Sequence, residues 1–459
     1  MFKIEFNSPV HVHFIGIGGI SMSGLAEILM DRGFTVSGSD NKESPLTDHL
    51  SEIGAKVSYP QKAENITDDI DVVVYTAAIH PDNPEFKAAK EAGLPMLTRA
   101  ELLGQIMENY KESIAVAGTH GKTTTSSMIS QILLSAQKDP TISIGGILPS
   151  IKSNVHVGSG DQFVLEACEY TNSYHSFFPK YNVILNVEED HMDFFKDLSD
   201  VRNSFRKFAS NTSSDGLLVI NRAIPDYSEI AADCKAKTVT FGMDSSADYY
   251  PEDIKYNELG LASFVPVAKG KSMQRISLHV PGEHNILNAL AAIAVCSEMG
   301  IDEKDMAEGF RTFTGADRRF QYKGKLKNGA IIIDDYAHHP TEISASLDTA
   351  RKLKDKRVVC IFQPHTYTRT KAFLKEFGAA LSKADLVVLA DIYAAREQDV
   401  YGVSSKDVAV EVKKNGTESL YFSTFEEIEK YIEKNSTPKD LLITMGAGDV
   451  FKIGEDLLQ

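Results

Sequence analysis

The chain has 459 residues, more than one hydrophobic core usually holds, so we expect about three domains. Its 64 acidic residues outnumber its 48 basic residues and give a formal net charge of -16. This balance argues against general binding to nucleic acid or to an anionic membrane, because both need a basic face.

The N-terminus and the cysteines indicate the compartment. Residues 1–14 contain no long apolar run, and no stretch approaches about 20 apolar residues, so we expect neither a signal peptide nor membrane insertion. Cys168, Cys234, Cys296 and Cys360 lie far apart and form no C-x-x-C pair, which is typical of a reducing environment. We therefore expect a cytoplasmic protein.

Short apolar runs alternate with amphipathic segments in the first part of the chain. The order of strand, helix and strand repeats, which predicts a parallel sheet with crossover helices. The segments are 10–18, 22–33, 35–40, 71–78 and 85–93.

A glycine-rich loop follows the first of these strands. Gly16, Gly18 and Gly19 come directly after it. Asp40 ends the next strand, where a ribose-binding acid would lie. The dinucleotide fingerprint fits imperfectly, because its third glycine falls at Met22 or at Gly19, depending on the register. We therefore favour another pyrophosphate over NAD as the ligand of this loop.

A second strand, glycine turn and helix are predicted over residues 113–136. The turn, GTHGKTTT at 118–125, lacks the first glycine of the common phosphate-loop pattern, since that position is Val116. It still offers backbone N–H groups and a helix N-terminus to an anion. Lys122 would reach the β- and γ-phosphates, and the Thr123 hydroxyl would meet Mg²⁺. The alternative is an ordinary glycine turn capped by threonines.

Acidic and histidine side chains follow two further apolar runs, within 162–169 and 181–195. Glu166 and Glu169 end the first run, at the edge where open α/β sheets bind ligands. Glu166 and a threonine hydroxyl supply the oxygen ligands that Mg²⁺ prefers. His191, after the second run, is as readily a polar loop residue as a metal ligand.

A long helix is predicted within residues 278–300, and a short basic segment, 315–326, follows it. We place a domain boundary near residue 325. Arg318 and Arg319 form either an anion-binding pair or an ordinary solvated turn, and the sequence leaves both open.

The alternation of strands and helices restarts after residue 326. The predicted segments are 330–353, 357–366, 385–395 and 440–449. Polar side chains directly after two of these strands predict a polar lip that faces the nucleotide domain. They are Asp335, Tyr336, His338, His339, His365 and Arg369. The adjacent histidines do not favour zinc, because no Cys or further His follows at ligand spacing.

Taken together, over nearly the whole chain, these motifs resemble those of the Mur ligase family, the ATP-dependent amide-forming enzymes of peptidoglycan precursor synthesis. The phosphate loop of that family is similar to G-T-x-G-K-T, as residues 118–123 have it, which accounts for Val116. Further segments occur in the family's order: FIGIGGISMSGLAE, EACEY, DHMD, HNILNALAA, RRF, DDYAHHPTE and QPHTYTRT.

The resemblance implies an α/β fold of three domains. It implies a Rossmann-like UDP-sugar domain at 1–105, a central P-loop-type ATP-binding domain at 106–325 and a Rossmann-like domain at 326–459 that closes the site. The implied reaction is the ATP-dependent joining of L-alanine to the carboxylate of UDP-N-acetylmuramate through an acyl phosphate. ATP and Mg²⁺ are the implied cofactors, and Mn²⁺ stays open.

The resemblance also implies residue roles. Lys122, His338 and Arg369 would be catalytic. Thr123 and Glu166 would hold one Mg²⁺, and His191 a second. ATP would contact Gly118, Thr119, His120, Gly121, Lys122, Thr123, Thr124, His284, Asn285, Asn288, Arg319 and Asp335. The sugar nucleotide and the amino acid would contact Gly16, Gly18, Gly19, Ser21, Met22, Asp40, Tyr336, His338, His365 and Arg369.

Two positions depart from the family pattern, and three other functions stay open. Thr366 stands where many relatives have Arg after the His of Q-P-H, and Cys168 stands where an acidic residue often lies between two glutamates.

A murein tripeptide ligase shares much of this motif set. A nicotinamide dehydrogenase would leave residues 118–125 and the last domain without a role, and a regulatory ATPase would hydrolyse ATP without needing an amine.

Overall fold

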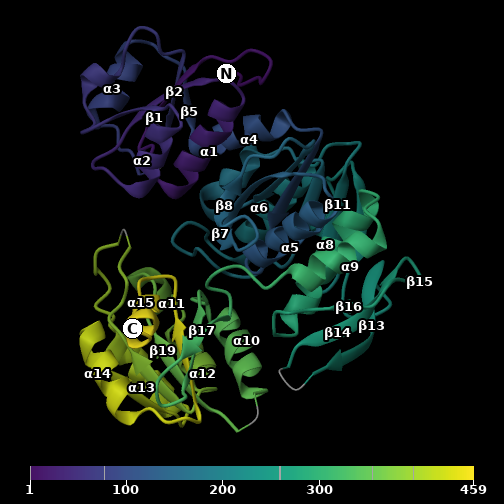
Figure 1. Ribbon diagram of the computed structural model, residues 1–459, viewed down its shortest axis with the longest axis vertical. Helices are drawn as coiled ribbons and strands as arrows, with labels where there is room; N and C mark the ends of the chain where they lie inside the picture. Colours follow the sequence, from purple (N-terminus) through teal and green to yellow (C-terminus); the bar gives the residue numbers. More distant parts are fainter. Residues whose placement is uncertain (1, 77, 258–259, 354, 396) are drawn as a thin grey trace.

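Three β-sheets follow one another along the chain, each flanked by helices (Figure 1). The computed structural model describes residues 2–459 apart from 77, 258, 259, 354 and 396. In Figure 1 the first unit lies at the top, the second in the middle and on the right, and the third at the bottom. The predicted α/β fold class is confirmed.

The first sheet has five parallel strands in the order β3-β2-β1-β4-β5. Its strands are β1 (His11–Ile15), β2 (Thr35–Ser39), β3 (Lys56–Ser58), β4 (Val72–Tyr75) and β5 (Met96–Thr98). Its helices are α1 (Ile20–Asp31), α2 (Pro45–Glu52), η1 (Ala63–Asn65), α3 (Pro84–Glu91) and α4 (Arg99–Glu108). The strand order reverses between β1 and β4, so the glycine loop after β1 lies where such sheets bind ligands.

The second sheet is mostly parallel at its centre, in the order β12-β11-β10-β6-β9-β7. Its strands are β6 (Glu112–Ala117), β7 (Thr141–Leu148), β8 (Ser153–His156), β9 (Gln162–Glu166), β10 (Tyr181–Ile184), β11 (Leu217–Asn221), β12 (Lys237–Phe241), β13 (Tyr249–Tyr256), β14 (Ala262–Ala268), β15 (Lys271–Ser272) and β16 (Ile276–Ser277). Its helices are α5 (Lys122–Ser135), η2 (Tyr170–Ser176), α6 (Leu198–Ser210), α7 (Tyr227–Ala231), α8 (His284–Glu298) and α9 (Glu303–Thr312).

Strand β6 is buried on both faces, as a central parallel strand should be. Ile114 and Val116 belong to the core that contains the buried faces of α5, α8 and α9. Ala115 and Ala117 belong to the opposite core, which includes α6 and continues into the first unit. Layers of helix on each face therefore hold the end of β6, and the phosphate loop that follows it, in a fixed place.

Strands β13 to β16 form an antiparallel extension of the second sheet, and we did not predict it. This stretch has no long apolar run, and its two longest strands contain Pro251 and Pro266, residues that usually argue against a strand. Alternating burial on a partly exposed extension gives a weaker sequence signal than a buried parallel strand does.

The third sheet runs in the order β17-β18-β22-β19-β20-β21, with β17 antiparallel and the others parallel. Its strands are β17 (Gln321–Lys325), β18 (Ile331–Asp335), β19 (Arg357–Phe362), β20 (Leu386–Leu389), β21 (Glu418–Tyr421) and β22 (Asp440–Met445). Its helices are α10 (Pro340–Arg351), α11 (Tyr367–Ala372), α12 (Leu374–Leu381), α13 (Ser405–Lys414), α14 (Phe425–Asn435) and α15 (Phe451–Leu457).

The first two units share a core at α4. Gly104 lies so close to η2 that a Cβ there would stand 2.1 Å from the Ser176 carbonyl oxygen. The third sheet begins at Gln321, because β17 pairs with β18. The predicted domain limits at 105 and 325 stay predictions.

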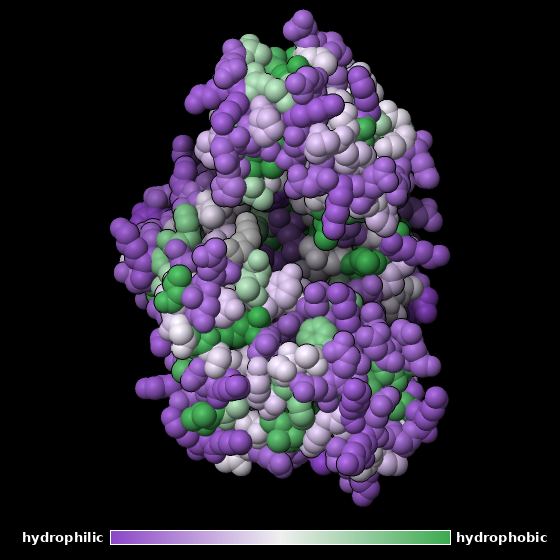
Figure 2. Space-filling view, turned by 90° about the vertical axis from the view of Figure 1, so that its left-hand side faces the viewer, coloured by the Kyte–Doolittle hydropathy of each residue, from purple (hydrophilic) through white to green (hydrophobic). Residues whose placement is uncertain are grey.

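The face drawn in Figure 2 is largely hydrophilic and is hollowed between its upper and lower parts. Among the described residues, no helix is long and apolar enough to span a membrane.

Candidate active site

The phosphate loop after β6 needs its two glycines for conformation and for space. Gly118 and Gly121 have φ of +144° and +84°, a region that side chains disfavour. A Cβ on Gly118 would stand 2.9 Å from Leu185 Cβ, and one on Gly121 would stand 2.6 Å from Asn288 Oδ1. The loop thus fits between β10 and α8, and α5 begins at Lys122.

Lys122 curls back over this loop. Its Nζ donates to the carbonyls of Gly118 at 2.5 Å and Thr119 at 3.1 Å, and it lies 3.0 Å from the Glu169 carboxylate. Burial alone would lower the pKa of Lys122, but the carboxylate of Glu169 outweighs it and the pKa rises above its ordinary value. The ammonium group is therefore charged and within reach of an anion on the loop.

Asn186 anchors the loop from β10, and sequence reasoning missed it. The backbone N–H of His120 donates to Asn186 Oδ1 at 2.7 Å, and Asn186 Nδ2 donates to the His120 carbonyl at 3.0 Å. One side-chain amide thus fixes both backbone groups of the loop residue. A lone Asn after an apolar run gives no signal of this role in the sequence.

A cavity of about 650 Å³ opens in front of the loop. Side chains from the second and third units line it together. Of the residues predicted to contact ATP or Mg²⁺, these line the cavity: Thr119, His120, Gly121, Lys122, Thr123, Thr124, Glu166, His191, His284, Asn285, Asn288, Arg319 and Asp335. Gly118 is not among the lining residues; its carbonyl accepts from Lys122 instead.

Oxygen atoms dominate the donor set predicted for a divalent cation. Glu166 Oε1 accepts from the Gly145 N–H at 2.5 Å, which orients its carboxylate at the end of β9. Thr123 Oγ1 accepts from Arg319 at 3.0 Å. His191 Nε2 lies 3.7 Å from an oxygen of Asp190. Hydroxyl and carboxylate oxygens suit Mg²⁺, so this donor set fits the ion.

Polar side chains at the start of α8 form another wall. Asn285 Nδ2 donates to the Pro281 carbonyl, and Asn288 Nδ2 donates to Asn285 Oδ1. Burial lowers the pKa of His284 to about 4, so this imidazole is neutral at pH 7. The wall therefore presents uncharged hydrogen-bonding groups, which suit a nucleobase.

Asp335 faces the same cavity from the end of β18. Its carboxylate accepts from Ser346 Oγ at 2.6 Å and from the Ala337 N–H at 2.8 Å. Burial raises its pKa to about 6. Nearby, Arg319 stacks on the ring of Tyr336 at 4.7 Å, which directs its guanidinium toward the phosphate loop.

The predicted polar lip of the third unit divides into two layers. Tyr336 and His338 line the cavity, whereas His365 and Arg369 are not among its lining residues. His338 donates through Nδ1 to the Tyr336 carbonyl at 3.0 Å, and burial lowers its pKa to about 3. The rings of His338 and His365 are 5.9 Å apart, and Arg369 Nη1 donates to His365 Nδ1 at 3.3 Å.

Arg369 also ties the third unit to the second. Its Nη2 lies 2.9 Å from Asp190 Oδ1, and both side chains are more than nine-tenths buried. Burial would raise the pKa of Asp190, but Arg369 lowers it well below its ordinary value. Sequence reasoning missed Asp190, although it directly precedes His191 in the same strand-end segment.

The N-terminal loop lies outside this cavity. None of the residues predicted there, Gly16, Gly18, Gly19, Ser21, Met22 and Asp40, is among those that line it. Asp40 Oδ2 accepts from the Gly18 N–H at 2.9 Å, so the acid holds its own loop. Arg99, which we did not predict, donates to Ser21 Oγ at 3.1 Å and brings a guanidinium to this loop.

The two departures from the family pattern have structural consequences. Thr366 has φ of +65° and accepts from the Arg369 N–H through its hydroxyl at 3.4 Å, so it caps α11. Cys168 is exposed to the cavity. The walls of the cavity desolvate its thiol in part, and together with the carboxylate of Glu169 they raise the pKa of the thiol to about 11, so it is neutral and a poor metal ligand.

Known protein families and relatives match the chain along most of its length. Residues 11–111 match the family described as "Mur ligase family, catalytic domain", residues 116–296 "Mur ligase middle domain", and residues 318–448 "Mur ligase, glutamate ligase domain". The chain is 61% identical to UDP-N-acetylmuramate--L-alanine ligase of Agathobacter rectalis and 58% identical to that of Lachnospira eligens, with all of each chain covered.

A solved structure agrees with these sequence matches. The chain is similar to the crystal structure of UDP-N-acetylmuramate-alanine ligase from Thermotoga maritima, with a TM-score of 0.79 and 31% identity. The similarity covers 97% of this chain and 98% of that one.

Proposed function

The chain belongs to the Mur ligase family, and we propose that it joins L-alanine to the carboxylate of UDP-N-acetylmuramate with ATP as the energy source. One observation supports this most. A single cavity brings together three features: a phosphate loop with a charged lysine, an oxygen-rich donor set, and a histidine-containing lip from another domain. Neither a dehydrogenase nor a simple nucleotide-binding protein needs that combination.

Activation of the carboxylate is the first chemical step. A carboxylate does not react with an amine at neutral pH, because its carbon is electron-rich and oxide is a poor leaving group. A carboxylate oxygen of the sugar therefore attacks the γ-phosphorus of ATP in line, and ADP leaves. Lys122 moves from Glu169 and its own loop onto the transferred phosphoryl group and neutralises the charge that spreads over it.

A divalent cation supports this step. Thr123 and Glu166 would hold one Mg²⁺ or Mn²⁺ ion and His191 a second, and these ions would supply positive charge to the phosphates. Arg319 adds a second cationic group beside Thr123. His284, Asn285 and Asn288 would contact the adenine, and Asp335 the ribose.

Amide formation is the second step. The neutral amine of L-alanine attacks the acyl carbon, the phosphate leaves, and the amine loses a proton. His338 is uncharged at pH 7, and its Nδ1–H is engaged by Tyr336, so Nε2 can accept a hydrogen bond from the amine. From outside the lining of the cavity, Arg369 would direct positive charge toward the carboxylate of the amino acid, and His365 would support its guanidinium.

Water must be kept from the acyl phosphate, and the third unit serves this purpose. Two contacts tie it to the second unit: Arg369 with Asp190, and Arg319 with Thr123; of these four residues all but Arg369 line the cavity. The loop of Gly16 to Met22 would hold the pyrophosphate of the sugar nucleotide, with Asp40 near the uridine.

Phosphate release from ATP and Mg²⁺ tests the proposal. UDP-N-acetylmuramate is present in each reaction, and L-alanine, glycine, L-serine or L-Ala-D-Glu-meso-diaminopimelate is added separately, with mass spectrometry of the sugar product. We expect release to depend on both the sugar and L-alanine, with a gain of one alanyl residue. A product formed only with the tripeptide would identify the murein tripeptide ligase instead. Release that ignores every amine would support a regulatory ATPase and overturn the proposal.

A further inference from the structure

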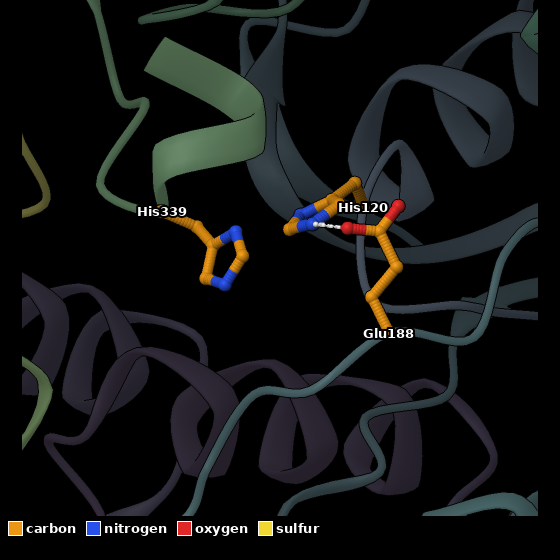
Figure 3. A group of neighbouring side chains, drawn as sticks. All are labelled: His120, Glu188 and His339. Atoms are coloured by element: carbon orange, nitrogen blue, oxygen red, sulfur yellow. Dashed lines mark ion pairs between the residues drawn. The ribbon is translucent and has the colours of Figure 1, made fainter. Parts of the chain in front are cut away.

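We propose that His120, Glu188 and His339 form a binding site for a transition-metal ion of the Zn²⁺ type, separate from the donors assigned to Mg²⁺. The ligand atoms of these three residues all lie within 4.8 Å of one another. Figure 3 shows the side chains converging, with one ring nitrogen of His339 facing His120 and a dashed line from His120 to Glu188.

The distances allow coordination with modest movement. In a tetrahedral zinc site, ligand atoms about 2.0–2.1 Å from the ion stand about 3.3 Å from each other. His120 Nε2 and Glu188 Oε2 are already 3.5 Å apart. The rings of His120 and His339 have centroids 4.8 Å apart. Closing the widest pair requires about 1.5 Å of movement.

His339 is held in the tautomer that a metal ligand needs. Its Nε2 lies 3.1 Å from the Glu189 carbonyl oxygen, which can only accept, so Nε2 carries the proton. The lone pair is then on Nδ1, which accepts from the Thr341 N–H at 3.3 Å as the N-cap of α10, and a metal ion would replace this capping contact. A backbone carbonyl on the second nitrogen is the usual partner of a metal-binding histidine.

His120 has the matching arrangement with a carboxylate. Its Nδ1 lies 3.2 Å from Glu342 Oε1, on the side away from Glu188. Both ring nitrogens are buried, and among the described residues neither has a hydrogen bond of good geometry. A zinc ion on Nε2 would replace the proton there, which is released to solvent, and Glu342 would accept from Nδ1–H.

The donor set selects the kind of ion. Two imidazole nitrogens and one carboxylate oxygen suit Zn²⁺, whereas Mg²⁺ prefers oxygen ligands. Sequence spacing disfavoured zinc at the His338–His339 pair, because the other ligands come from distant segments. The side chain of Glu188 is 41% exposed, so an ion can enter from the cavity.

Such an ion would join two domains. His120 lies in the phosphate loop and Glu188 follows β10, whereas His339 is the N-cap of α10 in the third unit. Bound Zn²⁺ would therefore fix α10 against the phosphate loop. Turnover needs that loop to exchange ADP for ATP, so we expect Zn²⁺ to inhibit the enzyme.

Binding of Zn²⁺ alone, without ATP or Mg²⁺, tests the site. The full-length protein competes with a chromophoric chelator, and we expect one tight ion per chain. His339→Gln and Glu188→Gln should each weaken binding by about 100-fold or more, and Glu342→Gln by about 10- to 100-fold, because it removes an outer hydrogen-bond partner. Glu188→Gln is the variant least expected to disturb folding, because this side chain is partly exposed. His156→Gln is the matched control, because His156 pairs with Asp139 elsewhere in the middle domain.

The absence of a tight site, or equal affinity in the wild type and both ligand variants, would overturn the proposal. A loss of affinity in His156→Gln equal to that in His339→Gln would do the same. Inhibition is measured separately as turnover with Zn²⁺ relative to each variant's own zinc-free rate, and it should be lost in His339→Gln. This second readout rests on the proposed ligase activity, whereas the binding readout does not, so the two failures are distinguishable.

Discussion

The loop after β6 and the loop after β1 share one local structure and differ in charge. Each follows a central strand of its sheet, leads into a helix and contains a glycine with positive φ, at +84° for Gly121 and +83° for Gly16. The β6 loop carries Lys122, which faces the carboxylate of Glu169. The β1 loop, GIGGISM, has no basic residue, and its cation, Arg99, comes from the start of α4.

This difference in charge distinguishes a loop that binds an anion from a loop that takes part in its reaction. Backbone N–H groups at a helix N-terminus are enough to hold a pyrophosphate that stays intact. A phosphoryl group in transfer spreads charge over its oxygens, so it needs a mobile cation that can follow it. We infer that the β1 loop holds a ligand and that the β6 loop takes part in the reaction.

Removing the cation of the β6 loop should have the largest effect. We expect Lys122→Ala to reduce turnover by at least about 10³-fold, because the charge on the transferred group loses its partner. Steady-state phosphate release measures this, and a melting curve checks the fold.

Glu169 needs its own control in that experiment. Its side chain is 2% exposed, so loss of Lys122 leaves a buried carboxylate without its cation. The double variant Lys122→Ala with Glu169→Gln removes both charges and should be equally inactive but more stable. Lys111→Ala, at an ion pair with Asp161 in which both side chains are exposed, should change neither property. Turnover near the wild-type level in Lys122→Ala would remove the lysine from the mechanism.

The buried carboxyl group of Asp335, in the same cavity as the β6 loop, should give the next largest effect, on stability. Burial raises the pKa of Asp335 to about 6 from its ordinary value of 3.8, so between these pH values the folded state binds a proton that the unfolded state has released. Stability should therefore fall as pH rises from about 4 to about 6, by about 3 kcal/mol. Melting temperatures across this range should decline more steeply for the wild type than for Asp335→Asn. Parallel profiles would contradict the assignment.

Glu166 should control the need for a divalent cation at the β6 loop. We expect Glu166→Gln to raise the Mg²⁺ concentration for half-maximal turnover by about 10- to 100-fold, because a neutral amide is a weaker ligand than a carboxylate. The amide oxygen can still accept from the Gly145 N–H, so the local fold is kept. Glu252→Gln, at an exposed position, is the control. An unchanged Mg²⁺ titration would rule out Glu166 as a ligand.

The order of strands and helices and the strand-end acids could be predicted from the sequence. Parallel strands are buried on both faces, so apolar runs such as that ending at Glu166 mark them clearly, and their carboxyl ends meet at one edge. The predicted helix within 278–300 is present as α8, beginning at His284.

Partners that lie far apart in the chain could not be predicted. Asn186 contacts His120 across 66 positions, and Arg369 contacts Asp190 across 179. No periodicity or spacing rule connects such pairs, because the first depends on which strands become neighbours in the second sheet and the other on how two domains pack. The zinc ligands proposed above belong to the same class.

Gly18 tests the β1 loop, with the smallest expected effect. A Cβ there would stand 2.8 Å from Asp40 Oδ2 and 2.9 Å from Thr47 Cγ2, so Gly18→Ala must displace the acid that holds the loop. We expect the KM for UDP-N-acetylmuramate to rise about tenfold, the loss of roughly one good hydrogen bond to the ligand.

The KM for ATP and the saturated rate serve as internal controls for Gly18→Ala, because the β1 loop does not line the cavity around the phosphate loop. Gly19→Ala provides a contrast, since its Cβ would meet the nearest atom at an ordinary 3.5 Å and should raise that KM less. If Gly18→Ala instead lowered the saturated rate with the sugar KM unchanged, the β1 loop would act in the reaction itself. The division between a loop that holds and a loop that reacts would then be wrong.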